Sequence, residues 1–329
     1  MSEPTVQATD LVVTLASARR RVVDEVSITI NPGQCLGLVG ESGSGKSVTA
    51  RALLGIPPEG MAVQGVLSVG GTRLDLGDRE AMRRWRSAEV GVIFQDPAAI
   101  MDPTRTVGDF VTEVLVHERG VAKALAHEQA ADLLTSMGLE DAAALLSRYP
   151  HEFSGGQLQR ICIAAALLPE PRLIIADEAT TALDTSSQAL VIALLDRARH
   201  ERGLSMLFIT HNLELALAFC DRIAVAYAGK VVELGEAETI AARAHHPYTQ
   251  ALLRSRPDPA RRRANLLAIA GQPPGLDVAL SGCVFRERCP RAAEDCLTSP
   301  EWTPTGTDTG FACFHPLTLA EGEEGSDAR

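Results

Sequence analysis

Short runs of alternating apolar and polar residues open the chain. Residues 11–15 (LVVTL) and 26–30 (VSITI) have the period-two pattern of half-buried strands, so we predict an N-terminal antiparallel sheet. Residues 35–40 (CLGLVG) are almost wholly apolar and predict a buried strand. Residues 47–55 then predict a helix that ends at a glycine, because two prolines follow and cannot continue it.

Helical periodicity replaces this pattern between residues 97 and 169, which predicts an all-helical insertion. Beyond it, a helix over residues 187–200 lies among three strand-like runs at residues 173–176, 206–210 and 222–229. Alternating strands and helices predict an α/β fold with a parallel sheet. A stretch rich in proline and arginine precedes a C-terminal part with little periodicity, so we place a domain boundary at residue 256.

Composition and charge are those of an ordinary soluble protein. Hydrophobic residues make up 46% of the 329 positions and charged residues 22%. The net charge of -11 argues against an electrostatic grip on nucleic acid or anionic lipid. The first ten residues lack the basic and apolar regions of a signal peptide. We therefore expect a cytosolic chain that reaches a membrane only through a protein partner.

The sequence GESGSGKS has the spacing of a phosphate loop and lies between a predicted strand and a predicted helix. Its backbone amides and the helix N-terminus would stabilise phosphate charge. Lys46 would neutralise the β- and γ-phosphates, and the Ser47 hydroxyl would bind Mg²⁺. A chance glycine-rich turn is the alternative, which the strand and helix on either side disfavour. The predicted ATP-binding residues are Gly40, Glu41, Ser42, Gly43, Ser44, Gly45, Lys46 and Ser47.

Two adjacent acids follow the apolar run at residues 173–176. At the end of a strand, Asp177 would hold Mg²⁺ through water and Glu178 would orient or deprotonate the attacking water. An ordinary solvated strand end would look the same, but the presence of Lys46 favours the functional interpretation. Gln95 and His211 also follow strand-like runs, so we expect both at the same sheet edge as Asp177.

Taken together, these motifs resemble those of ATP-binding-cassette (ABC) ATPases over residues 9–253. The resemblance implies a phosphate-loop NTPase cassette, with a RecA-like core, an antiparallel β subdomain and a helical subdomain, followed by a small cysteine-rich extension. The implied divisions are 1–96, 97–169, 170–255 and 256–329. Further site residues follow from the resemblance: Gln95 of the metal-sensing loop, the signature Ser154, Gly155, Gly156 and Gln157, Asp184 of the dimer-contacting loop, and the switch His211.

The signature turn opens a helix whose dipole would point at the γ-phosphate held by another subunit, whereas a simple helix cap is the alternative. The chain also departs from the family in three places. No aromatic residue precedes Trp85, so Leu15, Arg19, Arg20 or Arg21 must contact the adenine. Ala179 replaces a common proline and Asn212 a common aspartate, and neither change removes a catalytic group.

Residues 93–108 and 149–160 resemble the ATPases of oligopeptide, dipeptide and nickel importers. This implies a motor subunit at the cytoplasmic face of the membrane, in a head-to-tail dimer with a second, partly different ATPase chain. The implied partners are two integral membrane permeases and an extracytoplasmic solute-binding protein. Nickel or another small solute is the alternative cargo. A soluble cassette acting on DNA or ribosomes is disfavoured, because only residues 96–153 separate two of the motifs and one cassette is present.

Four of the seven cysteines fall within residues 283–313. By resemblance to the tail of these ATPases, Cys283, Cys289, Cys296 and Cys313 would bind a 4Fe-4S cluster, and their loose spacing with a proline after Cys289 agrees with that. Zinc is the first alternative and unreactive thiols the second. His315 could replace one ligand. The other three cysteines, Cys35, Cys162 and Cys220, lie in apolar runs and predict core positions.

Overall fold

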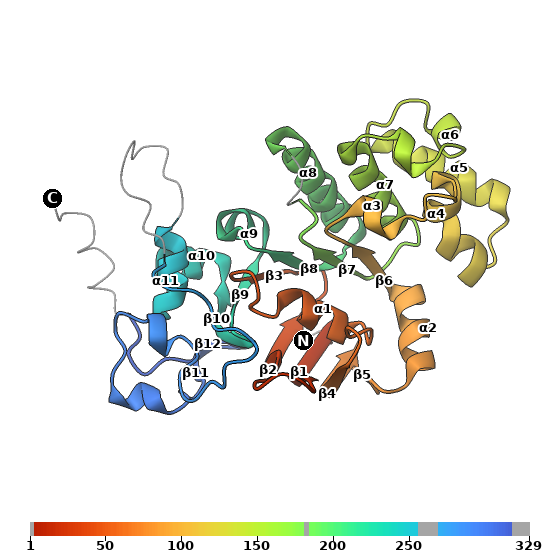
Figure 1. Ribbon diagram of the computed structural model, residues 1–329. Coiled ribbons are helices and arrows are strands. Elements are labelled where there is room, and N and C mark those ends of the chain that lie inside the picture. The colour runs from red at the N-terminus through yellow and green to blue at the C-terminus, as the bar shows by residue number, and fades with distance from the viewer. Residues whose placement is uncertain (1–2, 181–183, 256–268, 318–329) are drawn as a thin grey trace. The chain divides into compact units, whose positions relative to one another are not determined.

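The computed structural model describes residues 3–180, 184–255 and 269–317 (Figure 1). The chain forms two compact units. The first comprises residues 1–5, 31–34 and 78–209, and the second comprises residues 6–30, 35–77 and 210–329. The boundary expected at residue 256 lies outside the described residues, and the four-part division of the chain stays a prediction. No helix among the described residues has the length and apolar character needed to cross a membrane.

A parallel sheet of β6 (Val90–Ile93), β7 (Leu173–Asp177) and β8 (Ser205–Thr210) lies at the centre of the first unit. Every residue of β7 is buried, as expected of a central strand covered on both faces. The register pairs Ile93 with Ala176 and Asp177 with Ile209. The carboxyl ends of these strands therefore share one edge, where α/β proteins place their sites.

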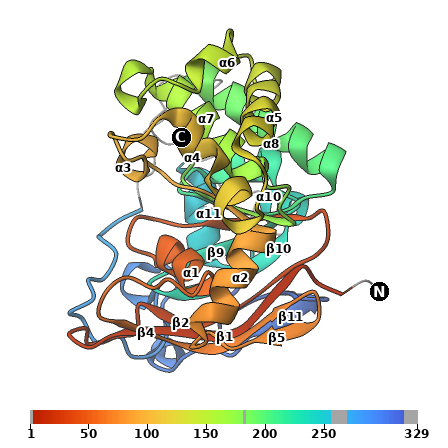
Figure 2. The same cartoon turned by 90° about the vertical axis from the view of Figure 1, so that its right-hand side faces the viewer.

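Helices make up the rest of the first unit. Residues 97–167 contain no strand, as the periodicity predicted. They form α3 (Pro97–Ile100), α4 (Val107–Glu113), the π-helical turn η1 (Val114–Glu118), α5 (Lys123–Ser136), α6 (Ala142–Leu145), the 3₁₀ turn η2 (Pro150–Glu152) and α7 (Gly155–Leu167). Helices α4 to α7 pack together in Figures 1 and 2. The unit also contains α2 (Arg79–Glu89) and α8 (Thr185–Arg202).

The second unit contains the predicted antiparallel sheet, with strand order β2-β1-β4-β5. Its strands are β1 (Val6–Leu15), β2 (Val23–Ile30), β4 (Met61–Val69) and β5 (Thr72–Leu74). Both predicted strands are confirmed, each longer than the alternating run that indicated it. The buried positions of β1 extend from Val6 to Val13, and their alternation breaks where the register with β2 shifts between Ala8 and Leu11.

A second sheet in this unit begins with β3 (Cys35–Val39), which is fully buried and parallel to β9 (Arg222–Tyr227). It continues antiparallel through β10 (Lys230–Glu236), β12 (Thr309–Phe311) and β11 (Thr303–Gly306). Residues 269–317, here called the C-terminal segment, thus extend a sheet of the second unit. The other elements are α1 (Lys46–Leu53), α9 (Leu213–Phe219), α10 (Ala237–Ala242), α11 (Pro247–Arg254) and the 3₁₀ turns η3 (Arg286–Arg288) and η4 (Glu294–Leu297).

Candidate nucleotide-binding and hydrolysis site

The phosphate loop connects β3 to α1 in the second unit. Lys46 is only 5% exposed, and its ammonium donates to the carbonyl oxygens of Gly40 at 2.8 Å and Glu41 at 3.0 Å. Its aliphatic stem is therefore buried while the charge stays inside the curve of the loop. These contacts hold the cation at the loop, as binding of a polyphosphate requires.

Glycine is required at two positions of this loop. A Cβ at Gly40 would lie 2.1 Å from the carbonyl oxygen of Ala226, which belongs to β9 and cannot move aside. Gly45 has φ +98° and a Cβ there would lie 2.8 Å from the carbonyl oxygen of Val22. A side chain at Gly43, at the exposed tip, would meet nothing within 4 Å, and only its φ of +78° favours glycine there. The base of the loop is thus tightly packed and its tip is open.

The predicted carboxylates lie at the sheet edge of the first unit. Asp177 ends β7 and is 9% exposed. Glu178 has φ +50°, and its amide donates to the carbonyl of Ile209 at 3.0 Å. Gln95 follows β6 at the same edge, and its Nε2 donates to Oε2 of Glu178 at 3.1 Å. The structure therefore brings Gln95 and Glu178 together, and the left-handed backbone at a non-glycine residue is typical of a functional position.

The signature turn is the capped N-terminus of α7. Ser154 Oγ accepts from the amide of Gln157 at 3.4 Å, and Gln157 Oε1 accepts from the amide of Ser154 at 2.9 Å. This reciprocal capping box confirms the predicted helix start. Gly155 is exposed, and a Cβ there would meet nothing within 4 Å. The amide-rich end of α7 is therefore open on the surface of the first unit.

Asp184 lies beside the signature turn. It is exposed at the start of α8, where Oδ1 accepts from the Ser187 amide at 3.1 Å and Oδ2 from the Ser187 hydroxyl at 2.7 Å. Ser187 Oγ would also lie 3.3 Å from a Cβ at Gly156. Ser187 thus joins the Asp184 loop to the signature. Sequence reasoning missed this serine, although an aspartate three residues before a serine at a helix start is a capping signal.

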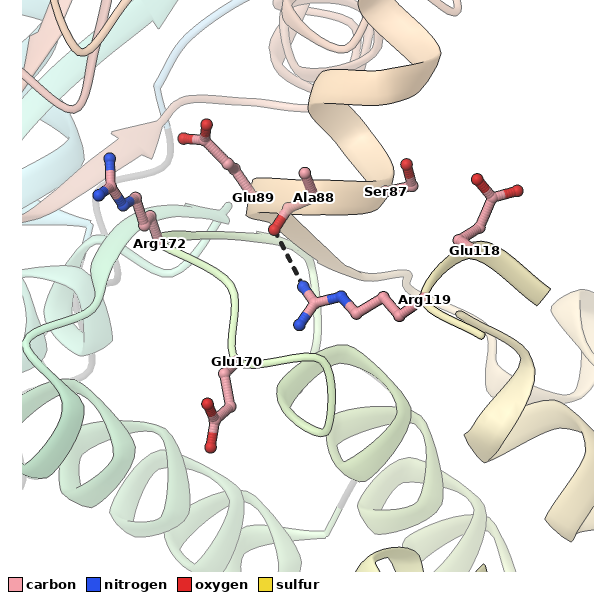
Figure 3. A pocket seen from close by; sticks show the side chains of 7 residues that line it. All are labelled: Ser87, Ala88, Glu89, Glu118, Arg119, Glu170 and Arg172. Atoms are coloured by element: carbon pink, nitrogen blue, oxygen red, sulfur yellow. Dashed lines mark hydrogen bonds between the residues drawn. The ribbon is translucent and has the colours of Figure 1, made fainter. Parts of the chain in front are cut away.

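Within the first unit, a small hollow of about 140 Å³ lies between the Gln95 loop, the signature turn and the residue after Glu178. Gln95, Gly155 and Ala179 line it, and so does Gln159, which is 1% exposed with an unpartnered Nε2. A separate hollow of about 490 Å³ lies where α2 leads into β6, and Arg119 there donates to the carbonyl of Ala88 at 3.0 Å (Figure 3). None of the predicted nucleotide residues lines the separate hollow.

His211 directly follows β8 in the chain and belongs to the second unit, as the phosphate loop does. It is exposed, and the next residue, Asn212, caps α9 by accepting from the amide of Leu215 at 3.1 Å. Asparagine therefore serves as the N-cap of this helix.

The adenine candidates also lie in the second unit. Arg20 donates to the carbonyls of Ala228, Gly275 and Pro274, and Arg21 pairs with Asp24 at 2.7 Å. Both guanidinium groups are therefore already hydrogen-bonded to other residues of the chain. A hollow of about 550 Å³ is lined by Leu15 and by residues 19–21. Leu280 and Val284 of the C-terminal segment also line it. Leu15 and Arg19 are the better candidates for a base contact.

The four cysteines of the C-terminal segment lie close enough to interact electrostatically. Cys283 donates its amide to the carbonyl of Cys296 at 3.0 Å, and the other three thiols all contribute electrostatically to the raised pKa of Cys313. Burial is the main cause, and it raises that pKa to about 11. None of the seven cysteines forms a disulfide. Cys35, Cys162 and Cys220 are buried in the core, as predicted.

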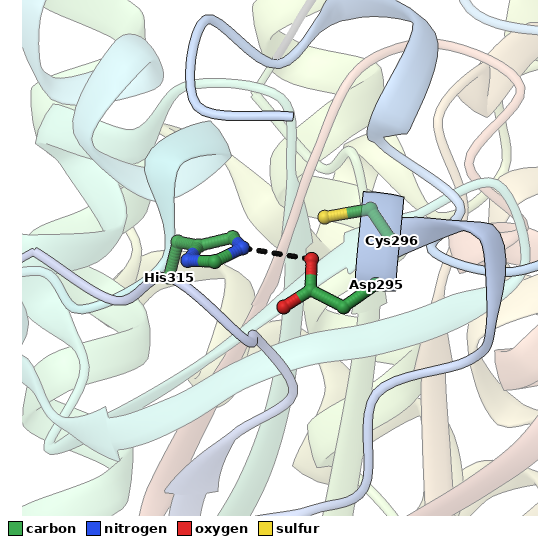
Figure 4. Close-up of side chains that lie close together, drawn as sticks. All are labelled: Asp295, Cys296 and His315. Carbon is green, nitrogen blue, oxygen red and sulfur yellow. Dashed lines mark hydrogen bonds and ion pairs between the residues drawn. The ribbon is translucent and has the colours of Figure 1, made fainter. Parts of the chain in front are cut away.

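Backbone amides point at these sulfur atoms. The amides of Phe285 and Arg286 hydrogen-bond to Cys283, that of Arg291 to Cys289 and that of His315 to Cys313. Near Cys296, the Nε2 of His315 lies 2.8 Å from Oδ1 of Asp295, and the three side chains could jointly hold a metal ion (Figure 4). Amide donors to sulfur stabilise bound thiolates, so the arrangement fits a thiolate-ligated group.

Comparison with known proteins agrees with this geometry. An ABC transporter profile matches residues 23–181, and a profile of the oligopeptide/dipeptide transporter C-terminal region matches residues 232–296. The oligopeptide transport ATP-binding protein OppD of Salmonella typhimurium is 38% identical over 314 residues, which is 94% of this chain and 93% of OppD. The chain belongs to the ABC transporter family. It is an ABC ATPase, and its ATP-binding cassette uses Mg²⁺.

Other ABC proteins are similar over comparable lengths. The probable D,D-dipeptide transport ATP-binding protein DdpD of Escherichia coli is 40% identical over 89% of this chain and 90% of its own. Among solved structures, the ATP-binding cassette MJ0796 in a dimeric post-hydrolysis state with ADP and Pi superposes with a TM-score of 0.63 at 25% identity. The superposition covers 70% of this chain and 98% of the MJ0796 chain. The predicted ABC cassette fold is thus confirmed.

Proposed function

We propose that this chain is the ATP-hydrolysing motor subunit of a membrane importer for peptides. The observation that carries the proposal is the presence, in one ABC chain, of the complete set of nucleotide motifs and of a C-terminal region like that of oligopeptide/dipeptide transporters. OppD and DdpD, whose names assign them to oligopeptide and D,D-dipeptide transport, are similar to it over nine tenths of their length.

Both units carry residues of the predicted hydrolytic set. From the second unit, Lys46 and the loop amides neutralise the phosphates, and His211 acts as the switch histidine. Asp177 of the first unit would be a ligand for Mg²⁺, as would Ser47 of the second, and the metal would supply positive charge to bound phosphates. Glu178 orients or deprotonates the attacking water. Gln95, which holds the Glu178 carboxylate, senses the metal and the membrane subunit.

Two such chains close over ATP head to tail, and each lends its signature turn to the nucleotide of the other. The open surface at Gly155 supports this, because a Cβ at that position would meet no atom within 4 Å. We expect Ser154→Arg to keep ATP binding and lose hydrolysis, since the added side chain blocks the donated amides. Thr135→Arg, at an exposed position of α5, is the matched control. Normal hydrolysis by the Ser154→Arg protein with its partners would disprove this arrangement.

The partners proposed are a second ABC ATPase, two integral membrane permeases and an extracytoplasmic solute-binding protein. This chain would then lie peripherally at the cytoplasmic face of the membrane. The direct test is purification of the chain with two candidate permeases and reconstitution in vesicles. We expect ATP hydrolysis to rise when the binding protein carries a peptide. Stimulation by nickel but not by peptides would refute the peptide assignment.

A 4Fe-4S cluster held by the four cysteines of the C-terminal segment is the second part of the proposal. The convergence of four half-buried or buried thiols, with amides directed at three of them, supports a thiolate-bound group. Anaerobic protein should be brown and contain about four irons and four sulfides per chain. Cys289→Ser should lose the colour, whereas Cys35→Ala in the core should keep it. Colourless protein that contains stoichiometric zinc would show that the cysteines bind zinc and not an iron-sulfur cluster.

A further inference from the structure

An arginine of the C-terminal segment forms an ion pair with the phosphate loop. Arg288, the last residue of η3, donates from Nη1 to Oε2 of Glu41 at 2.5 Å and from Nη2 to Oε1 at 3.0 Å. Glu41 is the second residue of the loop. The side chain of Arg288 is 4% exposed and that of Glu41 is 26% exposed. A two-pronged pair in such a sheltered place is among the stronger charge contacts in proteins.

Arg288 is fixed by neighbours on every side. Its Nε donates to the carbonyl of Ala270 at 2.9 Å, and its Nη1 also donates to the hydroxyl of Tyr227 at 3.3 Å. The guanidinium lies over the rings of Tyr227 and Phe285, with 5.7 Å and 6.0 Å to the ring centroids. These contacts, together with the ion pair to Glu41, hold the guanidinium in place.

The same aromatic cluster also holds the backbone of the loop. Tyr248 packs edge-on against Tyr227 with ring centroids 4.6 Å apart, and its hydroxyl accepts from the amide of Glu41 at 2.9 Å. Both the main chain and the side chain of Glu41 are thus fixed by residues that lie more than 180 positions later in the sequence. The phosphate loop and the C-terminal segment form one hydrogen-bonded assembly within the second unit.

A carboxylate in a phosphate loop is electrostatically unfavourable, because the ligand that the loop binds is a polyanion. At an effective dielectric constant of about 20, one unpaired charge several ångströms from a phosphate repels it appreciably. An arginine that pairs with both carboxylate oxygens removes most of that repulsion.

We propose that Arg288 is a positioning residue of the ATP site, which neutralises Glu41 and fixes the base of the phosphate loop. The C-terminal segment is then part of the nucleotide site as well as the carrier of the cysteines. This inference rests on the proposed ATPase function. It concerns the residues of this chain alone and holds whichever group the cysteines bind.

The test measures binding of a fluorescent ATP analogue with Mg²⁺ to four proteins. Arg288→Met should weaken binding on the order of tenfold, because Glu41 is left unpaired. Glu41→Gln should bind at least as tightly as the wild type. The double variant should return to within about twofold of the wild type. Arg286→Met is the matched control, since Arg286 is on the same turn and pairs with Glu287 at 2.6 Å.

The outcomes separate the possibilities. Recovery in the double variant supports the proposal, because neutralising Glu41 can restore binding only if its charge caused the loss. A double variant as weak as Arg288→Met, or a single variant equal to the wild type, would overturn it. A wild-type protein that binds no nucleotide would instead refute the proposed function. If Arg288→Met does not fold, Arg288→Lys provides the same comparison, with partial loss expected.

Discussion

His246 offers a direct test of the packing that supports the phosphate loop. It precedes α11, is 1% exposed, and its Nδ1 accepts from the amide of Tyr248 at 3.1 Å. Tyr248 in turn holds the amide of Glu41. Burial lowers the pKa of His246 from its usual 6.5 to about 3. Replacement by asparagine keeps an acceptor for the helix cap and removes the titrating group.

The sign and size of the pH effect follow from these two pKa values. The unfolded chain takes up a proton at His246 below pH 6.5, whereas the folded chain takes it up only near pH 3. The contribution of His246 to stability is therefore complete above pH 6.5 and is lost as the pH falls towards 3. Between pH 7.5 and pH 5.5 the free energy of unfolding should fall by about 1.4 kcal/mol from this residue alone.

Urea unfolding at pH 5.5, 6.5 and 7.5, for the wild type and His246→Asn, measures this slope. The variant should be less stable at pH 7.5, because a smaller side chain leaves a cavity, but its stability should depend less on pH by the amount above. Neighbouring groups cancel in the difference, since both proteins keep them. They are His245 and Glu233, whose pKa values burial lowers and raises respectively. Equal pH dependence in the two proteins would show that His246 is not held neutral.

Two further predictions concern the ATP site. Glu178→Gln should lower the hydrolysis rate by about 10²- to 10⁴-fold with ATP binding retained, because glutamine still accepts from Gln95 but cannot take a proton; steady-state hydrolysis and nucleotide binding check this, and unchanged hydrolysis would exclude Glu178 as the base. Gly40→Ala should lower the free energy of unfolding by about 3 kcal/mol or more, since its Cβ would lie 2.1 Å from a strand carbonyl. The control Gly77→Ala has its nearest contact at 3.3 Å on a flexible side chain and should lower it by less than about 1 kcal/mol. Thermal unfolding of both variants measures the difference.

Much of the fold and of the candidate site could be predicted from the sequence, because the signals are local. The phosphate loop, the capped start of α7 at Ser154 and the buried strand β7 each depend on a few consecutive residues. The pairing of Gln95 with Glu178 needed one further step, that parallel strands end at one edge of a sheet. Short-range pattern and the rules of sheet topology are sufficient for such features.

Contacts between distant residues had no such signal. Glu41 and Arg288 are separated by 247 positions, and nothing around either residue indicates the other. The strand β11 (TPTG) is fully exposed, so it has no apolar alternation to reveal it. Arg20 was a candidate for the adenine contact because it closely follows the first predicted strand and no aromatic residue precedes Trp85. Its three carbonyl acceptors include two from the C-terminal segment, which the sequence could not show.

These long-range contacts decide how the C-terminal segment must be studied. Removing it would delete the four cysteines, but also Arg288 and the carbonyls of Gly275 and Pro274 that hold Arg20. Loss of ATPase activity after such a truncation would therefore follow from the exposed carboxylate of Glu41 even if the cysteines had no part in hydrolysis. Point variants separate the two effects. Cys289→Ser changes the metal ligands and keeps the ion pair, whereas Arg288→Met with Glu41→Gln removes the ion pair and keeps all four thiols.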